Sequence, residues 1–430
     1  MCGIAGIFDL KGKRNIDKKL AEDLIGVLKH RGPDDDGYWN DSYAILVHTR
    51  LSIIDLSESG RQPMFNENES IVSTFNGEIY NFISLREDLI KKGYHFKGTS
   101  DSEILPFMYQ EYGERMVDYL EGMFAFAIYD KVRKKLFVAR DRLGIKPLYY
   151  HFNKESQNFY FGSEIKAIVV NKEVEKKVDY QAIYDYLGLN VIPEPATGFE
   201  SIFALEAAHC LEVSEQGLEI WKYWDIDNIS QINDSFKNAK EKLKCLINNS
   251  IKGQLIADAR LGAFLSGGID SSMVVANASR MVQNFPTFTV KFPDDKFDES
   301  SNAREVANHC QTDHHELVLK ELSGDPRFIN ELIHHFDQPF ADTSYIPTFL
   351  ISKMMRENIK VALSGDGGDE ILAGYHTFWF YKRIKMLSKI PHFFLRLLYW
   401  ASGVLAFWKP DLVRQTRKTL GLAQKKNSEV

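Results

Sequence analysis

The order of strand-like and helix-like segments changes between the two halves of this 430-residue chain. Before about residue 215, most segments are short apolar runs separated by turn signals such as Asn76-Gly77. Helical patterns are limited to residues 17–29 and 84–92, the second ending at Gly93. Many strands with few helices predict an α+β domain of layered antiparallel sheets with outer helices. Examples of the strand-like runs are residues 43–47, 70–75, 124–129, 135–139, 148–152 and 158–161.

After about residue 236, strand-like runs are followed by helical ones or by a glycine-rich loop. Strands are expected at residues 260–265, 287–292 and 360–363, and helices at 271–281 and 301–309. This alternation predicts an α/β domain with a parallel sheet, whose ligand binds at the carboxyl ends of the strands. The polar stretch at residues 226–233 is typical of a linker. We therefore expect one domain at residues 2–215 and a second at residues 236–430.

The net charge and the cysteine content limit which binding partners and which cellular compartment we expect. The formal net charge of -6 gives no reason to expect nucleic acid as a partner. The four cysteines are far apart in the sequence and show no metal-ligand spacing, which favours a reducing compartment. The apolar stretch at residues 393–408 contains Arg396 and is shorter than the ~20 residues of a spanning helix. We expect a packing helix there, no membrane partner and a cytoplasmic protein.

The sharpest local motif is a glycine- and serine-rich turn between a predicted strand and a predicted helix. Glycines let backbone N–H groups approach a phosphate closely, and a helix N-terminus favours an anion. Asp270 suits this setting if a divalent cation lies between its carboxylate and the phosphate. The Walker sequence GxxxxGK[ST] is absent, which argues against the usual transfer of a γ-phosphate. The motif reads Leu265-Ser266-Gly267-Gly268-Ile269-Asp270-Ser271-Ser272.

A second glycine-rich loop, residues 363–370, follows the strand predicted at residues 360–363. In a parallel sheet this loop opens at the same edge as the first one. Its acidic residues suit Mg²⁺ together with the phosphate oxygens of a substrate. A solvated acidic turn is the simpler alternative, but two such loops after two strands make it the weaker interpretation.

The chain also carries a cysteine in its second position, Cys2. If Met1 is removed, one residue carries both a thiol and a free α-amine. Such an amine titrates near pH ~7.7–8 and can accept the proton of a nucleophile at neutral pH. On position alone, a small residue that happens to follow Met1 is the simpler interpretation.

Taken together, these motifs resemble those of the glutamine-hydrolysing asparagine synthetases over nearly the whole chain. That family joins a class II glutamine amidotransferase domain of the N-terminal-nucleophile type to a synthetase domain of the ATP-pyrophosphatase type. Besides Cys2-Gly3-Ile4 and the two glycine-rich loops, the matching segments are residues 31–34, 48–53, 76–81, 100–103, 139–149 and 161–164.

For the first domain, the resemblance implies a glutaminase. Cys2 would attack the side-chain amide of glutamine, and Asn76 and Gly77 would form the oxyanion hole. Arg50 and Asp101 match the residues that hold the carboxylate and the amine of glutamine. The rest of the glutamine pocket would consist of Leu51, Ser52, Ile53, Ile54 and Glu78.

For the second domain, the resemblance implies that ATP is cleaved to AMP and pyrophosphate. Asp270 and Asp369 match acids linked to Mg²⁺, and Asp366 stands near the activated carboxylate, where the family often has Glu. The ATP site would consist of Leu265, Ser266, Gly267, Gly268, Asp270, Ser271, Val290, Ser364 and Gly365.

The implied reaction moves the amide nitrogen of glutamine to the side-chain carboxylate of aspartate, with ATP and Mg²⁺ as cofactors. Two alternatives stay open. The segment at residues 340–345 resembles a branch that includes sugar-modifying amidotransferases, so a uronic acid is a second acceptor class. The chain ends at Val430, earlier than family members, so we expect a C-terminally incomplete synthetase domain. A glutaminase or regulatory fragment is therefore the other alternative. The family is often dimeric, which allows a homodimer.

Overall fold

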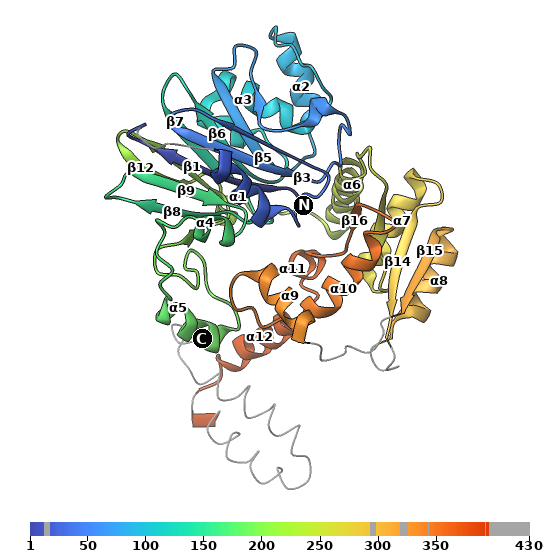
Figure 1. The fold of residues 1–430 in the computed structure, drawn as a ribbon. Helices are drawn as coiled ribbons and strands as arrows, with labels where there is room; N and C mark the ends of the chain where they lie inside the picture. Colours follow the sequence, from blue (N-terminus) through green and yellow to red (C-terminus); the bar gives the residue numbers. More distant parts are fainter. Residues whose placement is uncertain (13–17, 293–297, 319–325, 343, 392, 395–430) are drawn as a thin grey trace.

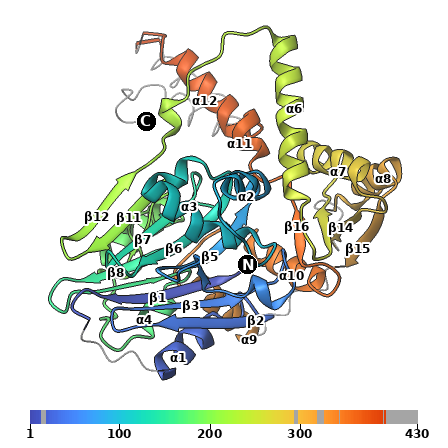
Figure 2. The ribbon, with the colours of Figure 1, turned by 90° about the horizontal axis from the view of Figure 1, so that it is seen from above.

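A computed structural model describes residues 1–12, 18–292, 298–318, 326–342, 344–391 and 393–394. These ranges contain three β-sheets, two in the N-terminal part of the chain and one in the C-terminal part. Figure 1 shows the two-sheet part above and beside a smaller part built around the third sheet. The N-terminus lies at the junction of the two parts in both Figure 1 and Figure 2.

The first sheet has the order β10-β8-β9-β1-β3-β2, and every neighbouring pair is antiparallel. Its central strand β1 begins directly after Cys2 and is buried along its whole length. Gly6 allows this close packing, because a Cβ there would lie 2.5 Å from the carbonyl oxygen of Ile45. The strands are β1 (Gly3–Asp9), β2 (Asp35–Asn40), β3 (Ala44–Arg50), β8 (Tyr149–Asn153), β9 (Asn158–Gly162) and β10 (Phe203–Ala204).

The second sheet has the order β12-β11-β7-β6-β5-β4 and is also antiparallel. It approaches the first sheet at β5, where the hydroxyl of Thr74 donates to the carbonyl of Val47, 3.2 Å away. This contact lies two residues before Asn76 on β5. The strands are β4 (Met64–Phe65), β5 (Ile71–Ile79), β6 (Gly122–Asp130), β7 (Lys135–Arg140), β11 (His209–Ser214) and β12 (Gly217–Lys222).

The alternation of side chains along the strands builds a layered core. On β1, Ile4 and Phe8 face the second sheet, whereas Ala5 and Ile7 pack on the outer helices of the first sheet. Each fully buried aliphatic or phenylalanine side chain contributes roughly 1.5–3 kcal/mol to stability. The helices of this part are α1 (Lys18–Leu28), α2 (Phe82–Lys91), α3 (Ile104–Tyr112), α4 (Lys166–Val169) and α5 (Tyr180–Leu189), with 3₁₀ turns η1 (Glu58–Gly60), η2 (Asp101–Glu103) and η3 (Gly113–Asp118).

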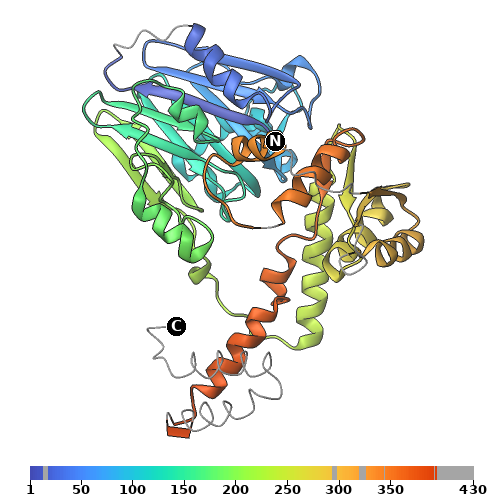
Figure 3. The ribbon, with the colours of Figure 1, turned by 60° about the horizontal axis from the view of Figure 1, so that its bottom comes forward.

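The third sheet is parallel, with the order β15-β14-β13-β16. Helices α6, α7 and α8 pack on one of its faces and α10 on the other. Figure 3 shows α9 and α10 between this sheet and the N-terminal part. The elements are η4 (Ile226–Asn228), α6 (Phe236–Gln254), β13 (Leu261–Phe264), α7 (Ile269–Met281), β14 (Pro286–Lys291), α8 (Ser300–Cys310), β15 (Asp313–Val318), α9 (Pro326–Phe336), α10 (Tyr345–Met355), β16 (Val361–Leu363), α11 (Gly368–Leu372) and α12 (His376–Leu387).

The predicted fold classes of both parts are confirmed: antiparallel layers with outer helices come first, and a parallel α/β sheet follows. The domain limits 2–215 and 236–430 stay a prediction; β12 extends the second sheet to Lys222, and α6 begins at Phe236. Within the described ranges, no helix is long and apolar enough to span a membrane. The helix expected at residues 393–408 lies, apart from residues 393–394, outside the described residues.

Candidate functional site

Cys2 is half-buried at the start of β1, and its position is held from both sides. The backbone N–H of Leu51 donates to the Cys2 sulfur, 3.4 Å away. The Nε of Arg31 donates to the carbonyl oxygen of Cys2 at 2.9 Å. The sulfur and the carbonyl of the expected nucleophile are therefore both fixed by neighbouring segments.

Burial raises the pKa of the Cys2 thiol, and the carboxylates of Glu78 and Asp101 act in the same direction. In the full chain the terminal amine belongs to Met1, and desolvation lowers its pKa to about 6. An amine in this environment is mostly neutral at pH 7 and can accept a proton. The Cys2 nitrogen itself becomes such an amine only when Met1 is removed.

The two residues expected to form an oxyanion hole lie near the end of β5. Asn76 is 1% exposed, and its Nδ2 has no hydrogen-bond partner among the described residues. A buried, unpaired amide donor costs roughly 1–3 kcal/mol unless a ligand accepts its hydrogen bond. A Cβ at Gly77 would lie 2.2 Å from the carbonyl oxygen of Met123, so only glycine fits there.

Arg50 is 6% exposed at the end of β3, and backbone carbonyls hold its guanidinium. Its Nη1 donates to the Ser57 carbonyl at 2.9 Å, and its Nη2 donates to the Asp55 carbonyl. Such an arginine is oriented before any ligand binds, which suits bidentate recognition of a carboxylate.

The segment that follows, residues 51–55, is fixed to the C-terminal part of the chain. The carbonyl oxygen of Ile53 accepts from the N–H groups of Asp258 and Ala259 at 3.0 and 3.1 Å. The carboxylate of Asp258 accepts the N–H of Asp55 at 2.8 Å. The predicted glutamine-binding segment is therefore part of the interface between the N-terminal and C-terminal domains.

The buried carboxylate of Asp101 and the half-buried carboxylate of Glu78 act on each other electrostatically. Asp101 is 5% exposed in η2 and accepts the N–H of Ile79 at 3.0 Å. Burial raises the pKa of Asp101 to about 6. Burial also raises the pKa of Glu78 well above its usual value, and the charge of Asp101 adds to this effect. A cation such as an α-ammonium group relieves this repulsion when it binds between the two carboxylates.

His48 is 1% exposed on β3, near the same site. Burial, together with the charge of Arg50, lowers the pKa of His48 to about 3. The imidazole therefore stays neutral at physiological pH, which suits a structural role.

In the C-terminal part, the loop between β13 and α7 has the predicted strand–turn–helix geometry. Gly267 has a φ of +81°, and a Cβ there would lie 2.5 Å from the Cβ of Asn302. The Ser266 hydroxyl accepts the N–H of Gly268 at 3.2 Å and lies 3.0 Å from the Ser271 hydroxyl. The loop thus presents hydroxyl groups at the N-terminus of a 13-residue helix, where an anion is favoured.

The second glycine-rich loop lies directly against the first. A Cβ at Gly365 would lie 2.8 Å from the N of Ser271, and one at Gly368 would lie 2.5 Å from the Cγ of Asp270. The glycines of the second loop therefore leave room for the Asp270 carboxylate. The structure confirms the expectation that both loops open at the same sheet edge.

The remaining residues predicted to bind the nucleotide lie on or next to strands β13, β14 and β16. Leu265 donates its N–H to the carbonyl of Phe288 on the neighbouring strand β14, which carries Val290 two residues later. Asp366 is exposed, and one of its oxygens accepts the Ser364 hydroxyl at 2.9 Å.

The donor set in these loops fits Mg²⁺ without forming a complete cage. Asp270 and Asp369 offer carboxylate oxygens, and Mg²⁺ is usually bound by one or two carboxylates plus substrate phosphates. The Asp369 carboxylate lies over Gly374, where an added Cβ would be 1.9 Å from its Oδ1. The described part of the chain contains no group of three or more His, Cys, Asp or Glu side chains arranged as a metal site.

A cavity of about 470 Å³ lies between the two domains. Met1, Arg31 and Leu51 line it on the side of Cys2, and Phe264 lines it one residue before the first glycine-rich loop. Its remaining lining residues are His30, Pro33, Asp34, Ser352, Met355, Arg356, Ile359, Lys360, Val361 and Ala362.

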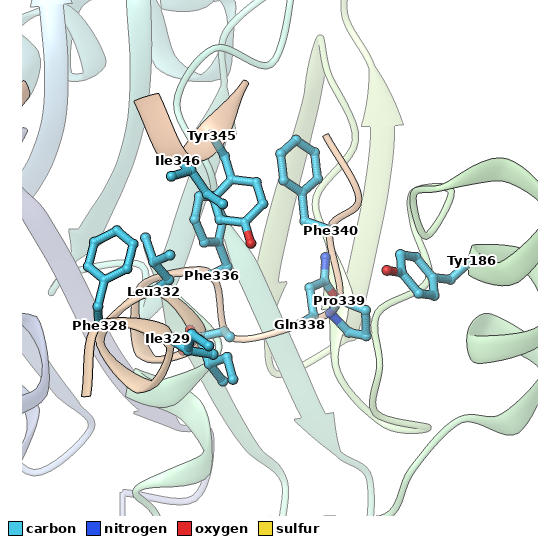
Figure 4. A pocket seen from close by; sticks show the side chains of 12 residues that line it. Tyr186, Phe328, Ile329, Leu332, Phe336, Gln338, Pro339, Phe340, Tyr345 and Ile346 are labelled. Atoms are coloured by element: carbon cyan, nitrogen blue, oxygen red, sulfur yellow. The ribbon is translucent and has the colours of Figure 1, made fainter. Parts of the chain in front are cut away.

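A larger hollow of about 640 Å³ is lined mainly by apolar side chains of α9, α10 and the segment between them (Figure 4). Tyr186 of α5 faces it from the N-terminal part, next to Gln338 and Pro339. None of the predicted site residues lines this hollow.

Sequence reasoning gave no role to three of the charged residues near Cys2. Arg31, Lys146 and Glu164 all lie in segments that match the family motifs. Arg31 is half-buried, Lys146 and Glu164 are buried, and all three lie near the thiol or the carbonyl of Cys2. The only available signal was the presence of charged residues inside otherwise apolar motifs. The contact between Arg31 and Glu164 joins residues 133 positions apart, so the sequence could not show it.

Comparison with known proteins divides the chain in the same way. A family described as glutamine amidotransferase domain matches residues 1–224, and one described as asparagine synthase matches residues 242–429. A Methanocaldococcus jannaschii protein named as a glutamine-hydrolysing asparagine synthetase is 36% identical over 417 residues, covering 91% of this chain and 79% of that protein. Asparagine synthetase 1 of Bacillus subtilis is 34% identical over 410 residues, covering 94% of this chain.

This chain spans 64% of the B. subtilis protein's length, just under two thirds. Among solved structures, a glutamine phosphoribosylpyrophosphate amidotransferase from B. subtilis gives a TM-score of 0.39 at 14% identity, over 74% of this chain and 81% of that one. That likeness is too distant to add to the assignment.

Proposed function

Because the chain belongs to the family of glutamine-hydrolysing asparagine synthetases, we propose that it transfers the amide nitrogen of glutamine to the side-chain carboxylate of aspartate. The reaction consumes ATP and releases AMP and pyrophosphate. Two half-reactions take place in different parts of the chain, with free ammonia passing between them.

The first half-reaction begins at Cys2 after Met1 is removed. The freed α-amine accepts the thiol proton, and the thiolate attacks the side-chain amide carbon of glutamine. The tetrahedral intermediate collapses to a γ-glutamyl thioester and ammonia, and water then releases glutamate. The Leu51 N–H, 3.4 Å from the sulfur, stabilises the thiolate.

The surrounding residues supply binding and transition-state stabilisation. The orphaned Nδ2 of Asn76 and the backbone of Gly77 donate to the developing oxyanion. Arg50 binds the α-carboxylate of glutamine, and the carboxylates of Asp101 and Glu78 accept its α-ammonium group. The single positive charge of bound glutamine's ammonium group offsets part of the carboxylate charge that adds to burial in raising the pKa of the Cys2 thiol.

The second half-reaction takes place at the two glycine-rich loops. The serine hydroxyls and the N-terminus of α7 bind the phosphates of ATP, while Leu265 and Val290 flank the adenine. Asp270 and Asp369 would hold Mg²⁺, which neutralises phosphate charge when bound. The aspartate carboxylate attacks the α-phosphorus, pyrophosphate leaves, and Asp366 lies near the acyl-adenylate. Ammonia then displaces AMP.

The observation that carries this proposal is the cavity of about 470 Å³ that both domains line. It reaches from the residues around Cys2 to the strands that carry the nucleotide loops. Ammonia in water at neutral pH is mostly ammonium, which is not a nucleophile. A path between the sites that excludes water would keep the nitrogen unprotonated until it meets the acyl-adenylate.

The test measures pyrophosphate release with aspartate and Mg-ATP, using either glutamine or ammonium chloride as the nitrogen source. Cys2→Ala should abolish the glutamine-dependent rate and leave the ammonia-dependent rate within twofold of the unmutated chain. Pyrophosphate release with a uronic acid but not with aspartate would contradict the proposed acceptor. Glutaminase activity without any ATP-dependent product would contradict the synthetase half.

A further inference from the structure

A chain of charged groups crosses the domain interface and ends on the backbone of Cys2. Asp337, which follows α9, lies 2.9 Å from the Nζ of Lys166 and accepts the Lys166 N–H at 3.0 Å. Lys166 Nζ also pairs with Glu164, and Glu164 accepts Nη1 of Arg31 at 2.8 Å. Arg31 Nε then donates to the Cys2 carbonyl at 2.9 Å. We refer to Asp337, Lys166, Glu164 and Arg31 as the relay.

The relay is enclosed, unlike most ion pairs at protein surfaces. The side chains of Arg31, Glu164, Lys166 and Asp337 are 9, 10, 10 and 12% exposed. Burial acts to raise the pKa of Glu164, but the hydrogen bond from His30 and the charges of Arg31 and Lys166 outweigh it and lower the pKa to about 2. Glu164 is therefore anionic at any working pH. Enclosed pairs of this kind depend on every partner, because a missing one leaves a buried charge unbalanced.

The charges of the relay balance only when the C-terminal part contributes Asp337. Arg31 and Lys166 are two cations, and Glu164 and Asp337 are two anions. Without Asp337, Lys166 has Glu164 as its one remaining anion in the relay, and it competes with Arg31 for that carboxylate. The ion pair between Glu164 and Arg31 then weakens, and so does the hydrogen bond from Arg31 to the Cys2 carbonyl.

The segment that carries Asp337 is docked on the N-terminal part at two further points. Gln338 Oε1 accepts the N–H of Gly198 at 3.2 Å, and the N–H of Ala341 donates to the carbonyl of Asn190 at 3.2 Å. Asp337 and Gln338 also line the hollow of about 640 Å³, and Figure 4 shows Gln338 there. The docked segment, residues 337–341, thus connects the hollow with the relay, because Asp337 belongs to both.

We propose that Glu164 and Asp337 are positioning residues for Cys2, so that docking of residues 337–341 sets the rate of glutamine hydrolysis. An N-terminal nucleophile has no chain before it once Met1 is removed, so its carbonyl contact is one of few anchors. Small displacements of a reacting group cost up to ~10²-fold in rate. This inference rests on the proposed glutaminase function.

The test is Asp337→Asn in the full chain, with glutamine hydrolysis and ammonia-dependent pyrophosphate release measured side by side. We expect kcat for glutamine hydrolysis to fall roughly threefold to tenfold. KM for glutamine should stay within twofold, because Arg50 and Asp101 are untouched, and so should the ammonia-dependent rate. The matched control is Glu331→Gln on α9, which neutralises a carboxylate whose pair with Lys353 is exposed; it should change neither rate.

A double variant separates the relay from a general loss of packing. If Asp337 acts through Glu164, Asp337→Asn should lower kcat no further in a Glu164→Gln background. Independent, multiplying effects would overturn the relay. An unchanged kcat in Asp337→Asn, or a parallel fall of the ammonia-dependent rate, would overturn it as well. If the unmutated chain hydrolyses no glutamine, the proposed function fails and this inference with it; a chain that hydrolyses glutamine but is indifferent to Asp337→Asn disproves the relay alone.

Discussion

Three of the side chains that would meet glutamine in the N-terminal domain are buried, whereas three of the loop residues that would meet ATP in the C-terminal domain are exposed. Arg50, Asn76 and Asp101 are 6, 1 and 5% exposed. Ser266, Gly268 and Asp366 are exposed, and Ile269 beside them is 86% exposed. Arg50 and Asn76 lie on strands, and backbone carbonyls hold Arg50, whereas Ser266, Gly268 and Asp366 lie on the loops that follow β13 and β16.

This contrast shows whether folding or ligand binding orders the groups of each site. In the N-terminal domain, folding orients Arg50, leaves the Asn76 donor without a partner among the described residues and raises the pKa of Asp101 to about 6. Small ligands then bind to groups that need little further ordering. At the open loops, substrate phosphates and Mg²⁺ must supply part of the order themselves.

The largest effect is expected at the open site. Asp270→Asn should lower pyrophosphate release about 10³-fold or more with either nitrogen source, because metal stabilisation of phosphate charge is worth several kcal/mol. Chelation of Mg²⁺ should do the same in the unmutated chain. Glutamine hydrolysis, measured in the same samples, should stay within twofold. A parallel loss of glutaminase activity would mean that the two sites are not organised independently.

A smaller effect is expected from the orphaned donor of the enclosed site. Asn76→Ala should lower kcat for glutamine hydrolysis about 10²–10³-fold, as removal of one oxyanion donor does elsewhere. KM for glutamine should change little, because the donor acts on the transition state. The control is ammonia-dependent synthesis, which should be unaffected. A rise in KM at constant kcat would show that Asn76 binds the ground state instead.

The pH dependence of glutamine binding gives the next test. A carboxyl group with a raised pKa is neutral below that pKa, and neutral Asp101 cannot pair with the α-ammonium of glutamine. Affinity should therefore be full well above pH 6 and fall about tenfold per pH unit below it. Calorimetric binding of glutamine to the Cys2→Ala variant from pH 5 to 8 measures this without turnover. Affinity that is flat across this range would contradict an enclosed Asp101–Glu78 pair.

The smallest effect is expected at a half-exposed contact between the domains. Lys360 Nζ lies 2.7 Å from Asp34, with side chains 39 and 28% exposed. Such pairs contribute about 0–1 kcal/mol, so Lys360→Met should change both half-reactions by less than ~5-fold. Thermal unfolding and both rate assays check this. A loss as large as that expected for Asn76→Ala would mean that this contact helps to organise the enclosed site.

Much of the fold was predictable because local patterns and tertiary packing agree. The strand predicted at residues 135–139 is β7 (Lys135–Arg140), and the helix predicted at residues 301–309 is α8 (Ser300–Cys310). The central strand β1 escaped prediction, because Gly3 and Gly6 weaken its strand pattern. Gly6 is there because neighbouring strands leave no room for a Cβ, which is a tertiary reason.

For the candidate site, the sequence motifs indicated individual residues but not the contacts between them. Asn76 and Asp101 are both buried in the N-terminal domain, and their roles in a glutamine site stay predictions. The relay from Asp337 to Cys2 had no sequence signal. Its members lie at residues 31, 164, 166 and 337 and meet only through folding.

By itself, the sequence determined the two fold classes, the family and the residue types that can carry each half-reaction, since these depend on local periodicity and short motifs. The tertiary structure alone decided which groups are enclosed, which donor is left unpaired and which charges join the domains. Burial, desolvation and long-range ion pairs depend on segments that are distant along the chain and adjacent only in the folded protein.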